Sequence, residues 1–428
     1  MKMRTAIVLA VVVGIAILAI LIAARRTQGP QQVLADGTRL TLVTVKAGHR
    51  HESPLATFRE RLAARLPASW NQRLKIQPPA ATRCEYSGSN YLSVWLTAEN
   101  CSSAPKFRLL IGDERDNFTI NAEHHGRSVS VSLSSNAWLI GLPVAAWPRR
   151  AETIRIQVYP KHDSKLLGEF RVKNPGRDLK TPPWTASAWP ITVRDGDLDF
   201  TLTSLWVGLG SSYRDWKLRA EKDPIQRWTR ASFRVTRQGE AQTNWIAHHV
   251  RAICDATGNW SDGNGFISII REGETMNHFS RPPLPADEAW RLTVEFSRLS
   301  GFSTEELHAV SRVSVPGPGQ SWRTATNSLG PDRLEFAWET RPSEGTNAVG
   351  VWITVQPIRS DHKLTLVRAT DDRGREVPFR NSGGGASVTH EELTFAPDAA
   401  WVDCVFAYHR SRVVTFQVKP EFYRPAGN

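Results

Sequence analysis

The sequence predicts a mainly β protein, in which an N-terminal transmembrane helix precedes two or three β-sandwich domains of immunoglobulin-like or jelly-roll-like type. Two observations predict this fold class. An uncharged apolar run fills residues 5–24, and beyond it apolar residues recur at every second position in many short stretches separated by turn-forming residues. Short alternating strands joined by regular turns are typical of sandwiches and barrels.

The apolar run TAIVLAVVVGIAILAILIAA at residues 5–24 is followed by Arg25 and Arg26. At about 1.5 Å of rise per residue, a helix of this length spans about 30 Å, the thickness of the hydrocarbon core of a bilayer. The alternative is a cleaved signal peptide, but that has a shorter apolar core and small residues at its cleavage site, whereas Arg25 directly follows Ala24. We therefore expect residues 1–29 to form a short N-terminus and a membrane anchor.

The basic residues on the two sides of this run nearly balance, so the positive-inside bias selects an orientation only weakly. Because only four residues precede the run, we expect a cytoplasmic N-terminus and a single-pass protein whose C-terminal bulk is extracytoplasmic. Secretion after signal cleavage is the alternative localisation.

One further helix is predicted near residues 54–66. Ser53 can cap it and Pro54 suits its first turn, and apolar residues recur at helical spacing at Leu55, Phe58, Leu62 and Leu66. The other face carries Arg59, Arg61 and Arg65, which would suit a membrane surface. A narrow, regular apolar stripe is more typical of a helix that covers a sheet.

Two proline-rich breaks, at residues 174–190 and 315–321, divide the exported part. The predicted domains are a first β-sandwich with the helix at 30–178, a second at 184–314 and a third at 322–428.

Short phrases also recur along the chain. EFRVKNP at residues 169–175 resembles TFQVKPE at 415–421, and in each an alternating Phe and Val precede a Lys and then a strand-ending Pro. We interpret both as the closing strands of decayed repeats of one module.

Three stretches, LADGTRLTLVTVKAGHRH, GEFRVKNP and VFAYHRSRVVTFQVKP, resemble features of uncharacterised bacterial proteins with one membrane span and a β-rich exported region. This resemblance covers scattered parts of the chain. It implies a location and a fold, and no activity.

The four cysteines include no CxxC pair, so the sequence contains neither a zinc-ribbon motif nor a thioredoxin-type motif. In an oxidising compartment Cys84 and Cys101 are candidates for a disulfide, worth about 3 kcal/mol in the chain-entropy model. A tight turn at residues 87–90 would instead place Cys84 opposite Ser93, so the bridge requires another strand arrangement. Cys404 alternates with Val402 and Phe406 and is predicted to be a buried apolar residue.

No catalytic residue is identified, because the sequence contains no nucleophile elbow, HExxH, Walker loop or dinucleotide fingerprint. His49 and His51 can share a strand face, but no further ligand completes a known metal spacing. The loop at residues 255–265 is rich in oxygen ligands and fails the EF-hand pattern at Trp260, so a polar hairpin loop is the better interpretation. We expect no metal and no cofactor.

Lysine and arginine total 54 against 42 acidic residues, a net charge of +12. Because these residues are spread over the whole chain without a recognisable binding module, no nucleic acid partner is expected, and anionic lipid or envelope polymer suits an exported basic protein better. Sugar-binding sandwiches use exposed aromatic rings as platforms. The tryptophans in loop-like or polar contexts are candidates for such stacking: Trp70, Trp184, Trp189, Trp216, Trp260 and Trp322. Tryptophans on strands, such as Trp95, more often fill a core.

These observations favour a membrane-anchored envelope protein with a non-enzymatic structural or interaction role. Its partners would be the lipid bilayer, through the N-terminal helix, and envelope proteins or anionic and glycan polymers. A carbohydrate-binding β-sandwich module is the first alternative, and an exported hydrolase without a recognisable motif is the second. An exposed row of aromatic residues on one sheet face would favour sugar binding, and a pocket with two close carboxylates would favour an enzyme.

Overall fold

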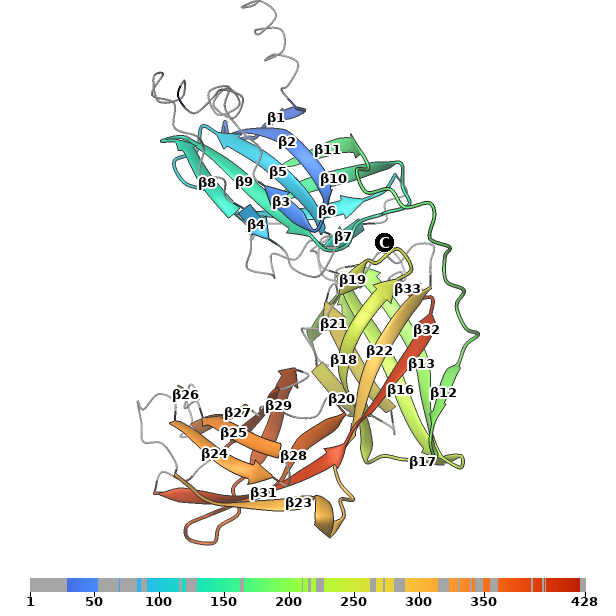
Figure 1. Ribbon diagram of the computed structural model, residues 1–428, viewed down its shortest axis with the longest axis vertical. Coiled ribbons are helices and arrows are strands. Elements are labelled where there is room, and N and C mark those ends of the chain that lie inside the picture. The colour runs from blue at the N-terminus through green and yellow to red at the C-terminus, as the bar shows by residue number, and fades with distance from the viewer. Residues whose placement is uncertain are drawn as a thin grey trace, which may run out of the picture. The chain divides into compact units, whose positions relative to one another are not determined.

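The computed structural model of the 428-residue chain describes residues 29–52, 69, 83–85, 91–114, 118–120, 129–161, 165–209, 211–214, 217–220, 227–261, 267–271, 274–280, 289–314, 323–329, 332–338, 341–342, 349–354, 361–385, 388–394, 396 and 398–423. Within these residues the chain is mainly β, as predicted, and its strands form mostly antiparallel sheets (Figure 1). The predicted span at residues 5–24 and the predicted helix near 54–66 lie outside the described residues. None of the helices in the described part of the chain combines the length and the apolar character needed to cross a bilayer.

The chain divides into two compact units between Pro182 and Pro183. The first unit is Met1–Pro182 together with Asp223–Ile225 and Thr257–Asn259, and the second contains the remaining residues. The boundary therefore lies inside the proline-rich stretch at 174–190.

The first unit contains a five-stranded and a four-stranded antiparallel sheet and a separate hairpin. The five-stranded sheet has the order β1 (Gln31–Val33), β2 (Arg39–Gly48), β5 (Tyr91–Glu99), β9 (Ala137–Val144) and β8 (Val129–Ser134). The four-stranded sheet has the order β11 (Gly168–Lys173), β10 (Thr153–Pro160), β6 (Phe107–Gly112) and β7 (Phe118–Ile120). The hairpin pairs β3 (Arg50–Glu52) with β4 (Arg83–Glu85).

Both large sheets of the first unit contribute to one hydrophobic core. The alternating strand β5 supplies Leu92, Val94 and Leu96, and the four-stranded sheet supplies residues such as Ile156 and Phe170. Trp95, the strand tryptophan predicted to fill a core, is 1% exposed, but it lies on the opposite face of β5 from these core residues. At about 25 cal/mol for each Å² of apolar surface removed from water, burial of this kind is the main force that holds two sheets together.

The second unit contains a seven-stranded sheet and a four-stranded sheet that we call the β22 sheet. The seven-stranded sheet has the order β12 (Ile191–Asp195), β13 (Leu198–Leu209), β16 (Arg227–Arg237), β21 (Glu274–Ser280) and β20 (Ile267–Arg271), with β17 (Glu240–Ala241) on β16 and β33 (Glu421–Tyr423) parallel to β13. The β22 sheet has the order β19 (Trp260–Ser261), β18 (Trp245–Asp255), β22 (Trp290–Arg298) and β32 (Arg412–Val418).

Aromatic rings from these two sheets meet in the core of a sandwich. Phe200 and Phe233 come from the seven-stranded sheet, and Phe296 and Phe416 come from the β22 sheet. The ring centroids of Phe200 and Phe296 are 4.6 Å apart, and those of Phe233 and Phe416 are 5.7 Å apart. Tilted aromatic pairs at these distances add to the stabilisation from buried area.

The other strands of the second unit form smaller sheets. One has the order β23 (Leu307–Ser314), β31 (Trp401–Arg410) and β28 (His362–Asp371). A second has the order β26 (Arg341–Pro342), β27 (Val349–Thr354), β30 (Val388–Leu393) and β29 (Phe379–Gly385). Two hairpins pair β14 (Ser211–Arg214) with β15 (Lys217–Ala220) and β24 (Arg323–Leu329) with β25 (Asp332–Trp338). A short 3-10 helix, Thr304–Glu306, precedes β23.

Two neighbouring strands connect the β22 sheet to the β23-β31-β28 sheet. Strand β31 continues into β32 with only Ser411 between them, and β22 leads through the 3-10 helix into β23 (Figure 1). Strand β32, which contains the TFQV phrase, pairs with β22 over seven residues. The sequence assigned this strand to the segment 322–428, whereas its pairing partner lies in the segment 184–314.

Candidate functional site

The outer face of the β22 sheet is the face that points away from the sandwich core. Along β22, Trp290, Leu292, Val294 and Phe296 belong to the core, so Arg291, Thr293 and Glu295 lie on the outer face. On β32 the core residues Val414, Phe416 and Val418 leave Val413, Thr415 and Gln417 on the outer face. The strict alternation in both strands fixes which side chains this face presents.

One row of side chains crosses the outer face from edge to edge. Trp260 on β19 is opposite Cys254 on β18, Cys254 is opposite Arg291 on β22, and Arg291 is opposite Gln417 on β32. Directly opposite residues of antiparallel strands project on the same side of a sheet, so these four side chains are neighbours. Trp260 is 36% exposed, and Arg291 is also exposed.

The segment after the unit boundary, Pro183–Trp189, lies along the β32 edge of this row. Gln417 donates from Nε2 to the Thr185 carbonyl, and the Ser187 amide donates to the Gln417 carbonyl. The Trp184 ring lies 4.0 Å from the guanidinium carbon of Arg291, a cation–π contact. The row therefore has a tryptophan at each end and an arginine between them.

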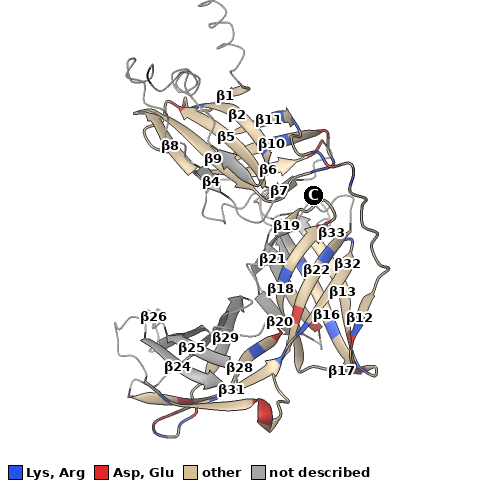
Figure 2. Cartoon of the chain, in the orientation of Figure 1, with Lys and Arg blue, Asp and Glu red and all other residues tan. Residues whose placement is uncertain are grey.

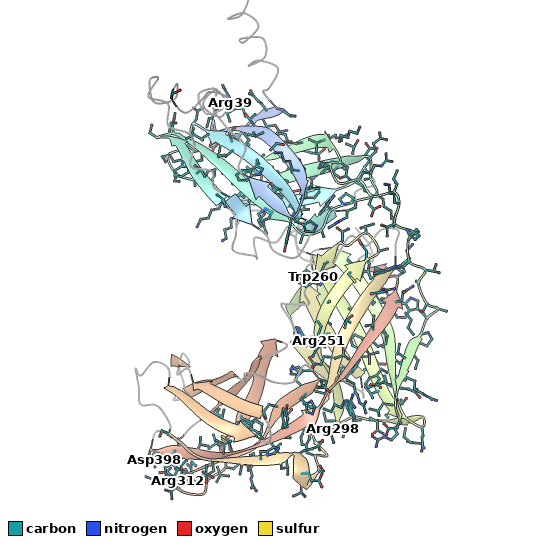
Figure 3. All side chains as sticks on the ribbon, in the orientation of Figure 1. Arg39, Arg251, Trp260, Arg298, Arg312 and Asp398 are labelled. Atoms are coloured by element: carbon teal, nitrogen blue, oxygen red, sulfur yellow. The ribbon has the colours of Figure 1, made fainter. Side chains whose placement is uncertain are left out.

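A second row lies two residues further along the strands. Thr293 is opposite both Ala252 and Thr415, and the two threonine hydroxyl oxygens are 3.1 Å apart. Figure 3 shows Trp260 and Arg251 at different levels of this sheet, with Arg298 beyond them. Figure 2 shows basic residues on the strands of this region.

The thiol of Cys254 lies between Trp260 and Arg291 and is half-buried. Burial raises its pKa, the nearby Asp255 carboxylate raises it further, and the positive charge of Arg291 acts in the opposite direction. The thiol is therefore a weak nucleophile at neutral pH.

At the other end of the outer face, a cluster of charged side chains is buried around Glu295. The Glu295 carboxylate, 0% exposed, accepts a hydrogen bond from Ser411 Oγ at 2.7 Å. Arg251 Nε lies 3.1 Å from its Oε2, and Lys363 Nζ lies 3.4 Å from the same oxygen. Because Lys363 is on β28 and Ser411 precedes β32, this cluster joins the two sheets of the second unit that share the β31–β32 connection.

Two irregularities in β18 position residues of this cluster. Its pairing with β22 skips His248, between Ala247 and His249, and skips Arg251, between Val250 and Ala252. Such β-bulges insert an extra residue and redirect its side chain. The bulge at Arg251 accompanies its contact with Glu295 while Val250 and Ile253 both remain in the core.

Burial shifts the pKa of several basic groups near Glu295. It lowers the pKa of Lys363, against the attraction of Glu295, and lowers that of His248 well below its usual value, helped by the charge of Lys363. The pKa of His409, which is 1% exposed, is lowered to about 4 by burial and by the charge of Arg298. His409 Nδ1 lies 3.3 Å from the Arg410 carbonyl and Nε2 lies 3.1 Å from Thr365 Oγ1. These contacts fit a neutral ring that donates from Nδ1 and accepts at Nε2.

Two other carboxylates with shifted pKa values are held by arginines. Glu169 accepts two hydrogen bonds from Arg155, at 3.2 and 2.8 Å, and these bonds are the main cause that lowers its pKa to about 2. Asp371 accepts hydrogen bonds from the backbone and the side chain of Arg375 at 2.8 and 2.6 Å. Burial alone would raise the pKa of Asp371, but the bonds from Arg375 and Arg373 lower it. Both carboxylates are therefore fixed acceptors at neutral pH.

The sequence-predicted site residues are only partly brought together. Trp184 and Trp260 lie on the same face of the β22 sheet, where Trp184 contacts Arg291 and Trp260 belongs to the same row as Arg291. Trp189 instead packs against the sandwich core. Trp216, Trp70 and Trp322 lie outside the described residues. Cys101 Sγ lies 3.5 Å from the Ala98 carbonyl, and Cys84 is opposite His51 in the register of the β3–β4 hairpin. The disulfide between Cys84 and Cys101 stays a prediction.

Sequence reasoning missed Arg291, Gln417 and the buried Glu295 cluster. The alternation in WRLTVEF contains a signal for Arg291, because it places this residue opposite to the apolar positions of its strand. Trp184 and Gln417 are close in space because of contacts between segments 232 residues apart, which a local sequence pattern does not reveal. Within the described part of the chain, no group of three or more His, Cys, Asp or Glu side chains is arranged to hold a metal ion. No family model matches the chain, and no curated protein is significantly similar to it.

Proposed function

We propose that this chain is a non-enzymatic, membrane-anchored envelope protein whose extracytoplasmic β-sandwich domains bind other components of the envelope. The observation that carries the proposal is the outer face of the β22 sheet, where Trp260, Arg291 and Trp184 follow one another in an accessible row. Side chains of this kind, aromatic and arginine, are enriched where proteins bind partners. The central strands of the sheet are paired on both sides, so the row stands on a rigid support.

The partners of the titratable groups support a binding role over a catalytic one. Glu295, Glu169 and Asp371 each accept hydrogen bonds from arginine, serine or backbone donors, which hold these carboxylates in fixed positions. His409, which is 1% exposed, is held on β31 by Thr365 and the Arg410 carbonyl. These groups have the surroundings of structural residues.

The proposed anchor is the apolar run at residues 5–24, with the N-terminus in the cytoplasm. The test uses intact cells that make the full chain, treated with a maleimide that does not cross the inner membrane. Mass spectrometry then measures labelling of a cysteine introduced by Ser130→Cys, at an exposed position of β8 in the first unit and away from the proposed face. We expect this cysteine to be labelled in intact cells and the chain to remain with the membrane after alkaline extraction.

Two results distinguish the alternatives. Labelling only after lysis would contradict the extracytoplasmic location. Release of a chain lacking its first residues into the medium or the soluble fraction would show a cleaved signal in place of an anchor.

A further inference from the structure

We propose that the outer face of the β22 sheet binds an acidic polysaccharide. This inference deepens the proposed function, because an extracytoplasmic face is where a protein meets such a polymer. It names the ligand of the row formed by Trp260, Cys254, Arg291 and Gln417, together with Trp184.

The two tryptophans provide the apolar part of the site. A sugar ring has an apolar face of C–H groups, and an indole ring is a rigid, flat partner with a polar N–H at its edge. Trp260 is two strands away from Arg291, so about 10 Å separates their backbones at the usual strand spacing. The row crosses four strands on an open sheet, which suits an extended polymer better than a single enclosed sugar.

Polar side chains around the tryptophans match the hydroxyl groups of a sugar. Gln417 uses Nε2 to hold Thr185, which leaves its Oε1 as an acceptor. The exposed Thr415 and the half-buried Thr293 share one hydrogen bond between their hydroxyls and retain further capacity to donate and accept. Both are directly next to the row along their strands.

The charge of the face selects an acidic ligand. Arg291 is exposed, and in the part of the chain that the structure describes no carboxylate forms an ion pair with it. The carboxylate on the same face, Glu295, is 0% exposed and is neutralised by Arg251 and Lys363. A guanidinium that stacks on a tryptophan keeps its N–H groups at the edge, where they bind a carboxylate or sulfate with two parallel hydrogen bonds. The net charge of +12 attracts polyanions at longer range.

The experiment measures binding of the full chain, purified in detergent, to four probes. Polygalacturonate is carboxylated, dextran sulfate is sulfated, dextran is neutral, and phosphatidylglycerol vesicles present phosphate on a lipid surface. We expect saturable binding to at least one of the two acidic polysaccharides, weakened by salt, and weaker binding to dextran by about tenfold or more. The carboxylated and sulfated polymers identify which acidic group Arg291 recognises.

Variants then test whether this face is the site. Arg291→Gln and Trp260→Ala should each weaken binding by about tenfold, because each removes one element of the row. The matched controls are Arg312→Gln and Trp401→Ala, a second arginine–tryptophan pair in the second unit, with the guanidinium 6.0 Å from the ring centroid. These controls should change the affinity by less than about twofold.

A measurement on the wild-type chain tests the proposal even if the variants misfold. Under reducing conditions at alkaline pH, a saturating acidic polysaccharide should slow alkylation of Cys254 by severalfold and leave Cys101, in the first unit, unchanged. The proposal would be overturned if Arg291→Gln bound the polymers as tightly as wild type, or if the control variants lost as much affinity as the Arg291 and Trp260 variants. It would also be overturned if the ligand did not protect Cys254, or if dextran or the vesicles were bound as tightly as the acidic polymers. These measurements use purified protein and do not depend on its cellular location. A negative result would therefore contradict polysaccharide binding, whereas the labelling of intact cells tests the proposed location.

Discussion

Lys363 Nζ lies 3.4 Å from Oε2 of Glu295, and the two side chains are 3% and 0% exposed. This ion pair joins β28 to β22, which belong to different sheets. Burying both charges costs several kcal/mol per ion, and the pair recovers that cost because Ser411 and Arg251 complete the hydrogen bonding of the carboxylate. The cluster thus fixes how the two sheets join more than it adds net stability.

Removing the carboxylate alone should therefore be strongly destabilising. Glu295→Gln leaves Lys363 and Arg251 without a counter-charge, and we expect a loss of about 3–5 kcal/mol in the free energy of unfolding. Replacing both partners, with Glu295→Leu and Lys363→Met, should cost much less than the sum of the single changes. Urea unfolding of wild type, Glu295→Leu, Lys363→Met and the double variant measures this double-mutant cycle. The Glu295→Gln variant is measured beside them, and a cost below about 1 kcal/mol for it would contradict the proposed role.

The neutral His409 predicts a loss of stability in mild acid. Its pKa is about 4 in the folded chain against an ordinary value of 6.5, so the unfolded state binds more protons between these values. Stability is full above about pH 6.5 and falls as the pH drops to about 4, by at most about 3 kcal/mol. Burial also lowers the pKa of His248, so its protonation below about pH 6.5 acts in the same direction.

His409→Gln should flatten the unfolding free energy between pH 6.5 and pH 4, measured by urea unfolding at a series of pH values. Glu169→Gln serves as the contrast, because a carboxylate with a folded pKa of about 2 loses its contribution only as the pH falls from about 4.5 to 2. The Glu169 variant should keep the wild-type slope above pH 4.5. An unchanged slope in the His409 variant would assign the acid sensitivity to other groups.

The sequence predicted the mainly β class, because alternation is a local property of a strand. It did not predict the burial of Glu295, which occupies a polar, outward position in WRLTVEF. That burial depends on Lys363 and on Ser411, which is 116 residues further along the chain. Pairing of β32 with β22 is equally non-local, since hydrogen bonds between strands carry no sequence signature at such separations.

The cysteines should differ in reactivity. Burial, with a contribution from Asp403, raises the pKa of Cys404 to about 12, and its side chain is 0% exposed. Cys101 and Cys254 are half-buried, and burial raises both pKa values less. In reduced, folded protein we expect alkylation of Cys101 and Cys254 well before Cys404, which should react only on unfolding.

Peptide mapping by mass spectrometry gives these rates and also tests the predicted disulfide. A peptide linking Cys84 to Cys101 should appear in chain isolated without reductant from an oxidising compartment, and only there. Free Cys101 in that material would rule out the bridge. Alkylation of Cys404 as fast as that of Cys254 would contradict the buried position on β31.

Phe416 tests which sandwich strand β32 completes. Its side chain is 0% exposed, and its ring centroid lies 5.7 Å from that of Phe233 on the seven-stranded sheet. Phe416→Ala should cost about 3–5 kcal/mol and increase amide hydrogen exchange in β18 and β22. The matched change in the first unit, Phe170→Ala on β11, should leave exchange in β18 and β22 unaltered. Increased exchange confined to residues 322–410 in the Phe416 variant would instead place the strand with the segment that precedes it in the sequence.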